Sequence, residues 1–448
     1  MWAQPSAAEA EAIRKEVDIT PAPADLSSFL RQIPPLGRRL RVAAPCVGIH
    51  GCGQSLLNMG VGADTINIFD LESGYKHWLD HHLREMGMQV ADIELHLGKI
   101  LGNLLKLPLD RLALPCDLLC CGPPCPPWSG LGNRGAMSDP RALVFVRIVI
   151  WIVILSHSGG LLMAIVENVK GVLHSHHGLE SAMDIFMRVL NTHVPFFHWR
   201  VDTLELQNYL APQTRVRTFL RGMRRSIVSQ VPAPLPAFGR RLLKDCLGPF
   251  PCTDRGTLSA QQQINLKVYE AKIKERVVAG SLQQSDVVTI AVDRQDDRIF
   301  LQKITVNAVP TLTTNNTPLW VVSVGCVVRD IPDQSRTFFR KLKETERLTL
   351  QSFPASLAMF LGSLTLKAAG NAYPPALITV VLNPMLMALD RFDLAAWPSS
   401  LPLGPPAGLV RQVQADLSAK PRVIDKRKFA KFVAESKRCR QADHDDSD

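Results

Sequence analysis

The stretch Arg41–Gln54, RVAAPCVGIHGCGQ, passes from an apolar run into a cluster of glycines. The apolar run predicts a buried strand, and the residues after it predict a short helix. Glycines at such a junction let the backbone approach a ligand, and the positive N-terminus of the helix favours an anion. Gly48, Gly51 and Gly53 are therefore candidate ligand-binding residues, although an ordinary tight turn would explain the same pattern.

Outward from this stretch, residues 41–210 alternate apolar runs with amphipathic segments. Repeated strand–helix units favour an α/β fold with a parallel, doubly wound sheet. From about residue 218 the chain becomes Pro-rich and basic with short apolar runs, which predicts a smaller, strand-rich region. The expected strands are 41–49, 64–72, 115–122 and 160–168, the expected helices are 75–87, 141–157 and 180–193, and the later strand-like runs are 286–293, 299–306 and 319–328.

The composition of the chain is that of a globular protein, with 448 residues that are 46% hydrophobic and 21% charged. Residues 214–448 hold 34 Lys and Arg against 21 Asp and Glu, an excess that suggests an anionic partner. The N-terminus does not have the pattern of a secretory signal, and the apolar run Leu143–Leu155 is too short for a membrane helix. We therefore expect a protein that is not secreted, located in the nucleus of a eukaryote or otherwise in the cytoplasm.

Four of the ten cysteines lie within ten residues, at positions 116, 120, 121 and 125. Paired C-x2-C knuckles are absent there, so we do not favour a zinc site. Cys116, Cys120 and Cys121 belong to an apolar run, where cysteine behaves as a small hydrophobic residue. Cys125 differs because it follows the strand in the proline-stiffened loop GPPCPPWSG, and ligands bind at the carboxyl ends of strands in open α/β sheets.

Acidic residues follow two of the other predicted strands. Asp70 and Glu72 lie about 20 residues after the glycine cluster, where a carboxylate can accept hydrogen bonds from ribose hydroxyls. Glu167 follows the apolar run LLMAIV and is a candidate acid or hydrogen-bond partner at the edge of the sheet. A helix cap is the alternative interpretation for each of these carboxylates.

The order of these motifs resembles the cytosine-5 DNA methyltransferase family. Gly48–Gly60 is similar to the glycine-rich first motif, Pro124-Cys125 to the proline-cysteine motif, and Glu167-Asn168-Val169 to the family's ENV. The further matches are Asp139, Arg141, Leu143 and Phe145; Pro212, Gln213, Arg215 and Arg217 of P-Q-x-R-x-R; Pro310–Thr313; Arg340, Leu342, Glu346, Leu350, Gln351, Phe353 and Pro354; and Gly370-Asn371-Ala372.

The resemblance implies a Rossmann-like, S-adenosylmethionine-dependent methyltransferase core that methylates cytosine in duplex DNA. Cys125 would be the nucleophile, Glu167 would hold the base, and Arg215 and Arg217 would contact the base and the covalent intermediate. The implied cofactor-binding residues are Gly48, Gly51, Gly53, Asp70, Glu72, Pro124 and Asn371. The implied domains are an N-terminal extension 1–40, a catalytic domain 41–217 and 340–395, a target recognition region 218–339, and a Pro-rich linker with a basic tail 396–448.

The sequence departs from the family pattern at several positions. Lys99 stands where the third motif usually has an acid, so we do not assign an adenine contact there. Pro126 and Trp128 follow Cys125 where many relatives have glutamine and phenylalanine. Tyr373 replaces a common valine after Gly-Asn-Ala.

Basic residues of the recognition region are candidates for contacts with DNA phosphates, although a solvated surface would explain them as well. The group HSHH, with His174, His176 and His177, is not favoured as a metal site. The segment Lys420–Arg440 suits a nucleic-acid-binding arm or an import signal, and a merely soluble, disordered tail would explain it equally well. Transfer to tRNA and a non-catalytic DNA-binding regulator are the alternative functions. The predicted DNA-contacting residues are Arg221, Arg224, Arg225, Arg240, Arg241 and Lys244.

Overall fold

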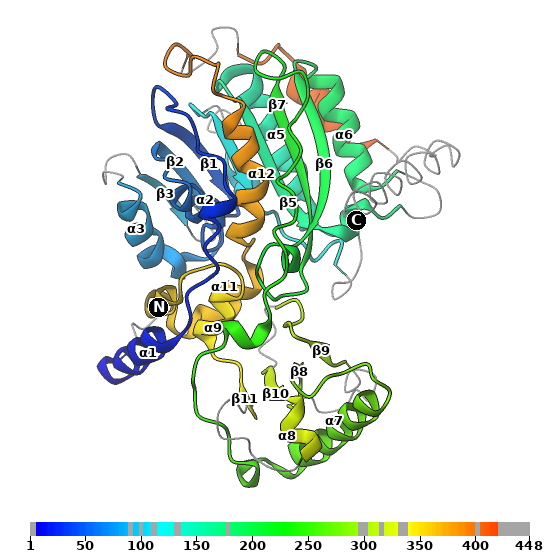
Figure 1. The fold of residues 1–448 in the computed structure, drawn as a ribbon. Coiled ribbons are helices and arrows are strands. Elements are labelled where there is room, and N and C mark those ends of the chain that lie inside the picture. The colour runs from blue at the N-terminus through cyan, green and yellow to red at the C-terminus, as the bar shows by residue number, and fades with distance from the viewer. Residues whose placement is uncertain are drawn as a thin grey trace, which may run out of the picture.

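The structure is a computed structural model of the chain, and it is described here for most of residues 6–419. The description covers residues 6–87, 93–97, 102–108, 114–129, 136–175, 180–293, 303–312, 318–329, 339–398 and 404–419. Two lobes of unequal size are visible in Figure 1, a large lobe around a central sheet and a small lobe below it.

The large lobe is built on a seven-stranded sheet with the strand order β3-β2-β1-β4-β5-β7-β6 (Figure 1). Strands β1 to β5 pair in parallel, whereas β7 is antiparallel to both β5 and β6. The expected α/β fold is therefore confirmed, with one reversed strand. The strands are β1 Leu40–Pro45, β2 Ala63–Asp70, β3 Ile93–Leu97, β4 Leu118–Cys121, β5 Met163–Val169, β6 Phe197–Glu205 and β7 Val216–Arg224.

Helices cover both faces of this sheet. Alternate residues of a strand enter opposite cores: Val42 of β1 packs with α2, α3 and α12, while Ala43 packs with α5, α6 and α13. Strands buried on both faces read as continuous apolar runs, which is why the sequence pattern located them. The helices are α2 Gly51–Asn58, α3 Lys76–Glu85, α5 Ala142–Ser158, α6 Ala182–His193, α12 Pro375–Met387 and α13 Leu409–Ser418.

The small lobe contains a four-stranded antiparallel sheet with the order β11-β10-β8-β9. A buried ion pair joins it to the large lobe: Arg340 of β11 donates to Glu346 of α9, and both side chains also bond the backbone of Gly248. The strands are β8 Val287–Ile290, β9 Thr305–Val306, β10 Trp320–Ser323 and β11 Phe339–Lys341; the remaining helices are α1 Ala7–Ile19, α7 Ala260–Val278, α8 Val324–Arg329, α9 Glu344–Thr349, α10 Ala358–Leu361 and α11 Thr365–Asn371.

Three details of the predicted organisation are wrong. β7 is part of the central sheet, and Leu235 still packs in the large lobe, where its amide donates to the Val380 carbonyl, so the separate small lobe does not begin at residue 218. The run 319–328 is strand only to Ser323 and then helix α8. The 19-residue helix α7 lies in the region predicted to be strand-rich. The prediction for 299–306 falls partly outside the described residues.

Among the described helices, none combines the length and apolar character needed to cross a membrane.

Candidate active site

Cys125 lies in the loop that follows β4, at the carboxyl edge of the central sheet. Its carbonyl accepts hydrogen bonds from the amides of Trp128 and Ser129, both at 3.0 Å, which closes a tight turn around the thiol. The neighbouring strand holds this loop, because Asn168 Nδ2 donates to the Pro123 carbonyl at 3.2 Å. The cysteine is only partly exposed, so its surroundings control its reactivity.

Glu167 and Arg217 face this loop from two adjacent strands. Glu167 lies near the end of β5. The next residues of β5 pair with β7, Asn168 with Thr218 and Val169 with Arg217. Arg217 Nε lies 2.7 Å from Glu167 Oε1, an ion pair without the angles of a hydrogen bond. The carboxylate is buried, and its Oε1 accepts no hydrogen bond from the described residues, so this oxygen can still bond a ligand.

Opposing electrostatic effects act on these groups. Burial raises the pKa of the Cys125 thiol, Glu167 raises it further, and Arg217 and Arg215 lower it. Burial also raises the pKa of Glu167 above its ordinary value, although both arginines oppose this effect. A raised pKa favours the protonated form of the Glu167 carboxyl group, and that form can donate a hydrogen bond or a proton to a ligand.

Arg215 is buried next to the site and is held there by hydrogen bonds to backbone carbonyls. Its guanidinium donates to the carbonyl of Leu312 at 3.2 Å and to the carbonyl of Ala372. Burial, and next the positive charge of Arg217, lower the pKa of Arg215 to about 9. Arg215 thus joins Leu312 to the Gly370-Asn371-Ala372 segment, and its charge lowers the pKa of both Cys125 and Glu167.

The glycine cluster forms the turn between β1 and α2. Gly48 has a φ of +55°, and a Cβ placed on it would have no neighbour within 4 Å, so open space lies over this residue. Asp70 fixes the turn because its carboxylate accepts from the amide of Gly48 at 2.8 Å and from that of Glu72 at 2.9 Å. Burial raises the pKa of Asp70, but these two amides oppose the shift.

Glu72 follows Asp70 two residues along the chain, and its amide donates to the Asp70 carboxylate. Its carboxylate accepts from the Gly74 amide at 3.1 Å and from Lys367 Nζ at 2.6 Å. Burial opposes ionisation, but Lys367 outweighs it and the pKa of Glu72 is lowered. Asn371 is the last residue of α11, and its side chain lies next to Tyr75, three residues after Glu72. Gly48 with open space over it, the carboxylate of Asp70 bonded to its amide, and the polar side chains of Glu72 and Asn371 suit a ligand rich in hydroxyl and amine groups.

The structure contradicts part of the predicted DNA surface. Arg221 is fully buried and pairs with Asp202 at 2.9 Å, and Arg224 is buried with its guanidinium bonded to the carbonyls of Leu161 and Ser156. Arg225 is exposed, but it follows the last residue of β7. That end of β7 lies beside the start of β5. These arginines thus lie toward the edge opposite Cys125 and do not form the predicted surface.

Arg240, Arg241 and Lys244 lie where the chain passes between the lobes. Two backbone hydrogen bonds locate this passage. The Gly239 amide donates to the Asn208 carbonyl of the large lobe, and the Leu243 amide donates to the Asn307 carbonyl of the small lobe. Other predictions lie outside the described residues: Lys99, Thr313, His176, His177 and the tail from Lys420.

The sequence did not identify two residues that shape the site. Asn168 was noted only as part of a motif, yet it holds the loop of Cys125. His50 lies inside the glycine cluster in a left-handed conformation, with φ +62°, that favours glycine. A bulky residue among glycines was the available signal for His50.

The fold and the site together define a class: an α/β protein with a cysteine, a carboxylate and an arginine at the carboxyl edge of its sheet, beside a glycine-rich turn. Residues 106–386 match the C-5 cytosine-specific DNA methylase family. This match covers more than half of the chain, and the protein belongs to that family.

Two relatives share part of the sequence. The type II methyltransferase M.MthTI of Methanothermobacter thermautotrophicus is 29% identical over 131 residues, 29% of this chain and 37% of that protein. The orphan methyltransferase M.SPRI of Bacillus phage SPR is 26% identical over 197 residues, 42% of this chain and 39% of that protein. The chain therefore spans less than half the length of either relative.

Solved methyltransferase structures align over most of the chain. EhMeth of Entamoeba histolytica has a TM-score of 0.47 at 13% identity, with 79% of this chain and 99% of that chain covered. A DNA modification methyltransferase encoded within an E. coli prophage has a TM-score of 0.48 at 16% identity, with 78% and 99% covered.

Proposed function

We propose that the protein is a DNA (cytosine-5)-methyltransferase acting on a cytosine flipped out of duplex DNA. The observation that carries the proposal is the meeting of Cys125, Glu167 and Arg217 at one edge of the sheet. The open space over Gly48 adjoins the same edge, so that a methyl donor and a base can bind side by side.

Cys125 supplies the nucleophile. Its thiolate adds to carbon 6 of cytosine, forming a carbon–sulfur bond while the electrons of the 5,6 double bond make carbon 5 nucleophilic. After carbon 5 takes the methyl group of the donor, its proton passes to water and the electrons of that carbon–hydrogen bond restore the 5,6 double bond. The carbon–sulfur bond breaks in the same step, and Cys125 leaves as a thiolate. The loop prolines and the Asn168 hydrogen bond hold the thiol for both steps.

Glu167 and Arg217 stabilise the charge that develops in the ring. The protonated Glu167 carboxyl donates to ring nitrogen 3 and accepts from the exocyclic amine, and it takes the proton back when the ring is restored. Arg217 faces the same pocket and suits the base carbonyl, while Arg215 remains bonded to backbone carbonyls behind it.

The donor site suits S-adenosylmethionine, which when bound supplies an electrophilic methyl group and departs as a neutral thioether. Asp70 and Glu72 would hold ribose hydroxyls, and the turn at Gly48, Gly51 and Gly53 would lie along the donor. Pro124 and Asn371 would complete the site from the nucleophile loop and from the end of α11.

The substrate is duplex DNA, gripped by Arg240, Arg241 and Lys244 at the crossing between the lobes. Flipping the base costs a few kcal/mol, which contacts in the pocket and to the phosphates offset. We also infer that the protein acts where DNA is found, in the nucleus of a eukaryotic source or the cytoplasm of a prokaryotic one.

The test is incubation of the protein with S-adenosylmethionine and duplex DNA that contains 5-fluorocytosine. Fluorine at carbon 5 cannot leave as a proton does, so the Cys125 adduct is expected to accumulate as a band of retarded mobility. Bisulfite sequencing of ordinary methylated DNA then gives the target context. Cys125→Ser is expected to form no adduct, whereas Cys252→Ser, in the small-lobe part of the chain, is expected to form it normally.

Two results would overturn the proposal. One is methylation of ordinary DNA without an adduct on the fluorinated duplex, and the other is an adduct that persists in Cys125→Ser. A parallel assay with tRNA tests the substrate, because methylation of tRNA but not of duplex DNA would contradict the DNA assignment.

A further inference from the structure

Tyr373 connects the glycine-rich turn with the loop of the proposed nucleophile. It follows Asn371 and Ala372, and its ring is almost completely buried. A Cβ placed on Gly51 would lie 2.9 Å from Tyr373 Cδ2 and would also overlap its carbonyl, while a Cβ placed on Gly122 would lie 2.7 Å from Cδ1. The two edges of one ring therefore touch two glycines, one at the start of α2 and the other at the end of β4.

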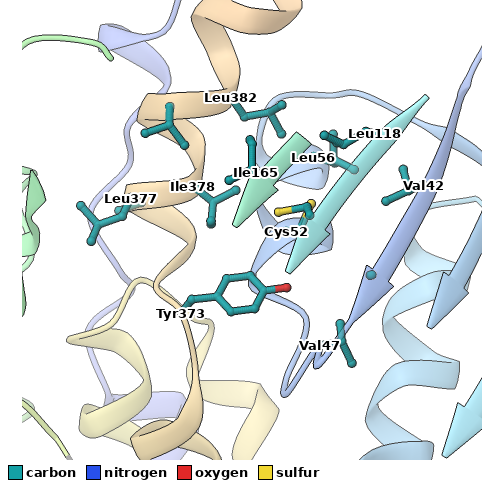
Figure 2. Close-up of a cluster of buried hydrophobic side chains, with 14 of the residues drawn as sticks. Val42, Val47, Cys52, Leu56, Leu118, Ile165, Tyr373, Leu377, Ile378 and Leu382 are labelled. Carbon is teal, nitrogen blue, oxygen red and sulfur yellow. The ribbon is translucent and has the colours of Figure 1, made fainter. Parts of the chain in front are cut away.

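These glycines belong to the two halves of the site. Gly51 begins α2, directly after the glycine-rich turn between β1 and α2, which is called the donor turn from here on. Gly122 precedes the loop of Cys125. The position of a Cβ on Gly122 is also 3.3 Å from Glu167 Oε2, so the ring edge and the proposed acid meet at that glycine. Figure 2 shows the ring below Cys52 of α2, with its hydroxyl directed toward the ends of the strands that carry Leu118 and Val42.

The hydroxyl group does not account for the presence of tyrosine. It is buried and has no hydrogen-bond partner among the described residues, and its neighbours include the thiols of Cys52, Cys120 and Cys121. An unsatisfied buried hydroxyl costs about 1–3 kcal/mol. Among the described residues, the close contacts of Tyr373 at Gly51 and Gly122 are therefore made by its ring and its carbonyl.

We propose that Tyr373 is a positioning residue whose ring, held between Gly51 and Gly122, sets the separation of the donor turn from Cys125 and Glu167. The inference rests on the proposed function, because the separation matters only if a donor and a base react across it. Misplacement of reacting groups by about 1 Å can lower a rate on the order of 100-fold.

The experiment compares Tyr373→Val with Tyr373→Phe. The valine variant removes the ring, and we expect kcat at saturating donor to fall at least tenfold. Calorimetric binding of S-adenosylhomocysteine and the rate of Cys125 alkylation by iodoacetamide should each change less than threefold, because each half of the site stays intact. The phenylalanine variant keeps the ring, so kcat should stay within threefold of the parent value and the melting temperature should rise.

Gly122→Ala supplies an independent test of the steric contact. In the parent chain the added methyl group should clash with the ring and lower the melting temperature, whereas in the Tyr373→Val background it should be tolerated. Equal melting-temperature losses in both backgrounds would overturn the spacer role, as would loss of kcat in Tyr373→Phe or an unchanged kcat in Tyr373→Val. If the parent protein does not methylate DNA, the proposed function fails, and the Gly122 comparison alone then decides whether the ring is a spacer.

Discussion

Asn168 Nδ2 donates to the carbonyl of Pro123 at 3.2 Å, so the strand that carries Glu167 also holds the loop that carries Cys125. The same side chain accepts from the amide of Val169 at 2.8 Å. One amide group thereby fixes the strand end and the neighbouring loop relative to each other. Cys125 and Glu167, the two side chains proposed to react with the base, are thus positioned by a polar contact as well as by apolar packing.

Replacement of Asn168 by aspartate should separate these two bonds. The new carboxylate would still accept from the Val169 amide but could not donate to Pro123, so we expect the loop to loosen and adduct formation to slow by about tenfold. Leaving a buried carbonyl unpaired costs about 1–3 kcal/mol, which should also lower the melting temperature. Asn103→Asp is the matched control, because within the described residues Asn103 accepts from the Leu105 amide and its side chain donates no hydrogen bond. Unaltered adduct kinetics in Asn168→Asp would refute the clamp.

Glu167→Gln should increase the reactivity of the free thiol while lowering methylation. Burial raises the pKa of Cys125 and the Glu167 carboxylate raises it further, so removing that charge should move the pH midpoint of iodoacetamide alkylation downward. Arg217→Gln should move the midpoint upward, because Arg217 favours the thiolate. Methylation should fall by about 100-fold or more in Glu167→Gln, since proton transfer to the ring is lost. Midpoints that shift in the same direction in both variants would contradict this electrostatic arrangement.

Protonation of two buried histidines should destabilise the donor turn in acid. His50 and His82 lie edge to face at 5.4 Å between ring centres, and none of their ring nitrogens has a hydrogen-bond partner among the described residues. Burial, followed by the charge of His81, lowers the pKa of His82 to about 4, and burial also lowers that of His50. Glu85, 4.0 Å from His82 Nδ1, favours the charged form but does not outweigh burial.

The direction of this effect follows from proton linkage. An unfolded histidine, with an ordinary pKa near 6.5, binds protons at a pH where folded His82 does not, so this contribution is complete above about pH 6.5 and is lost toward pH 4. At about 1.4 kcal/mol per pKa unit, His82 alone accounts for about 3 kcal/mol. His82→Phe should therefore flatten the fall of stability between pH 6.5 and 4 in urea titrations, whereas His77→Phe on the exposed side of the same helix should not. Identical pH profiles for His82→Phe and the parent would refute this.

The sequence was sufficient to predict the core of the fold and the ends of its strands. Doubly buried strands such as β4 and β5 are continuous apolar runs, and chemically distinctive residues follow them, so Cys125 and Glu167 could be placed at one edge. The amphipathic pattern of α7 was missed because only Leu266, Tyr269 and Ile273 of its apolar residues are buried, while Ile264 and Val268 are exposed. Contacts such as those of Tyr373 with Gly51 and Gly122 join residues far apart in the chain, and local pattern carries no information about them.

The arginines of β7 show the same limit for charge. In a sequence, Arg221 and Arg241 are equivalent members of a basic cluster, yet only packing decides that Arg221 is fully buried against Asp202 while Arg241 remains partly exposed. A cluster of charges predicts a surface only when the strand direction is known. β7 starts at the edge of the sheet where Cys125 lies and runs antiparallel to β5, so its later arginines lie at the opposite edge, near the start of β5.

Because of this difference, two kinds of arginine substitution should have separate effects. Arg221→Met should remove the buried one of the two arginines that pair with Asp202 and leave only the partly exposed Arg200. The fold should therefore lose stability, by less than the about 3–5 kcal/mol of a fully broken buried pair, and Asp202→Leu in the same chain should recover much of the loss. Because Arg221 does not touch DNA, the salt dependence of DNA binding by the folded variant should not change.

Replacement of Arg240, Arg241 and Lys244 by Ala should have the opposite effect: an unaltered melting temperature, weaker binding, and a slope of log affinity against log salt reduced by about one for each phosphate that is no longer neutralised. Fluorescence anisotropy with duplex DNA over a salt series measures that slope, and a triple variant that keeps the parent slope would show that the DNA path lies elsewhere on the protein.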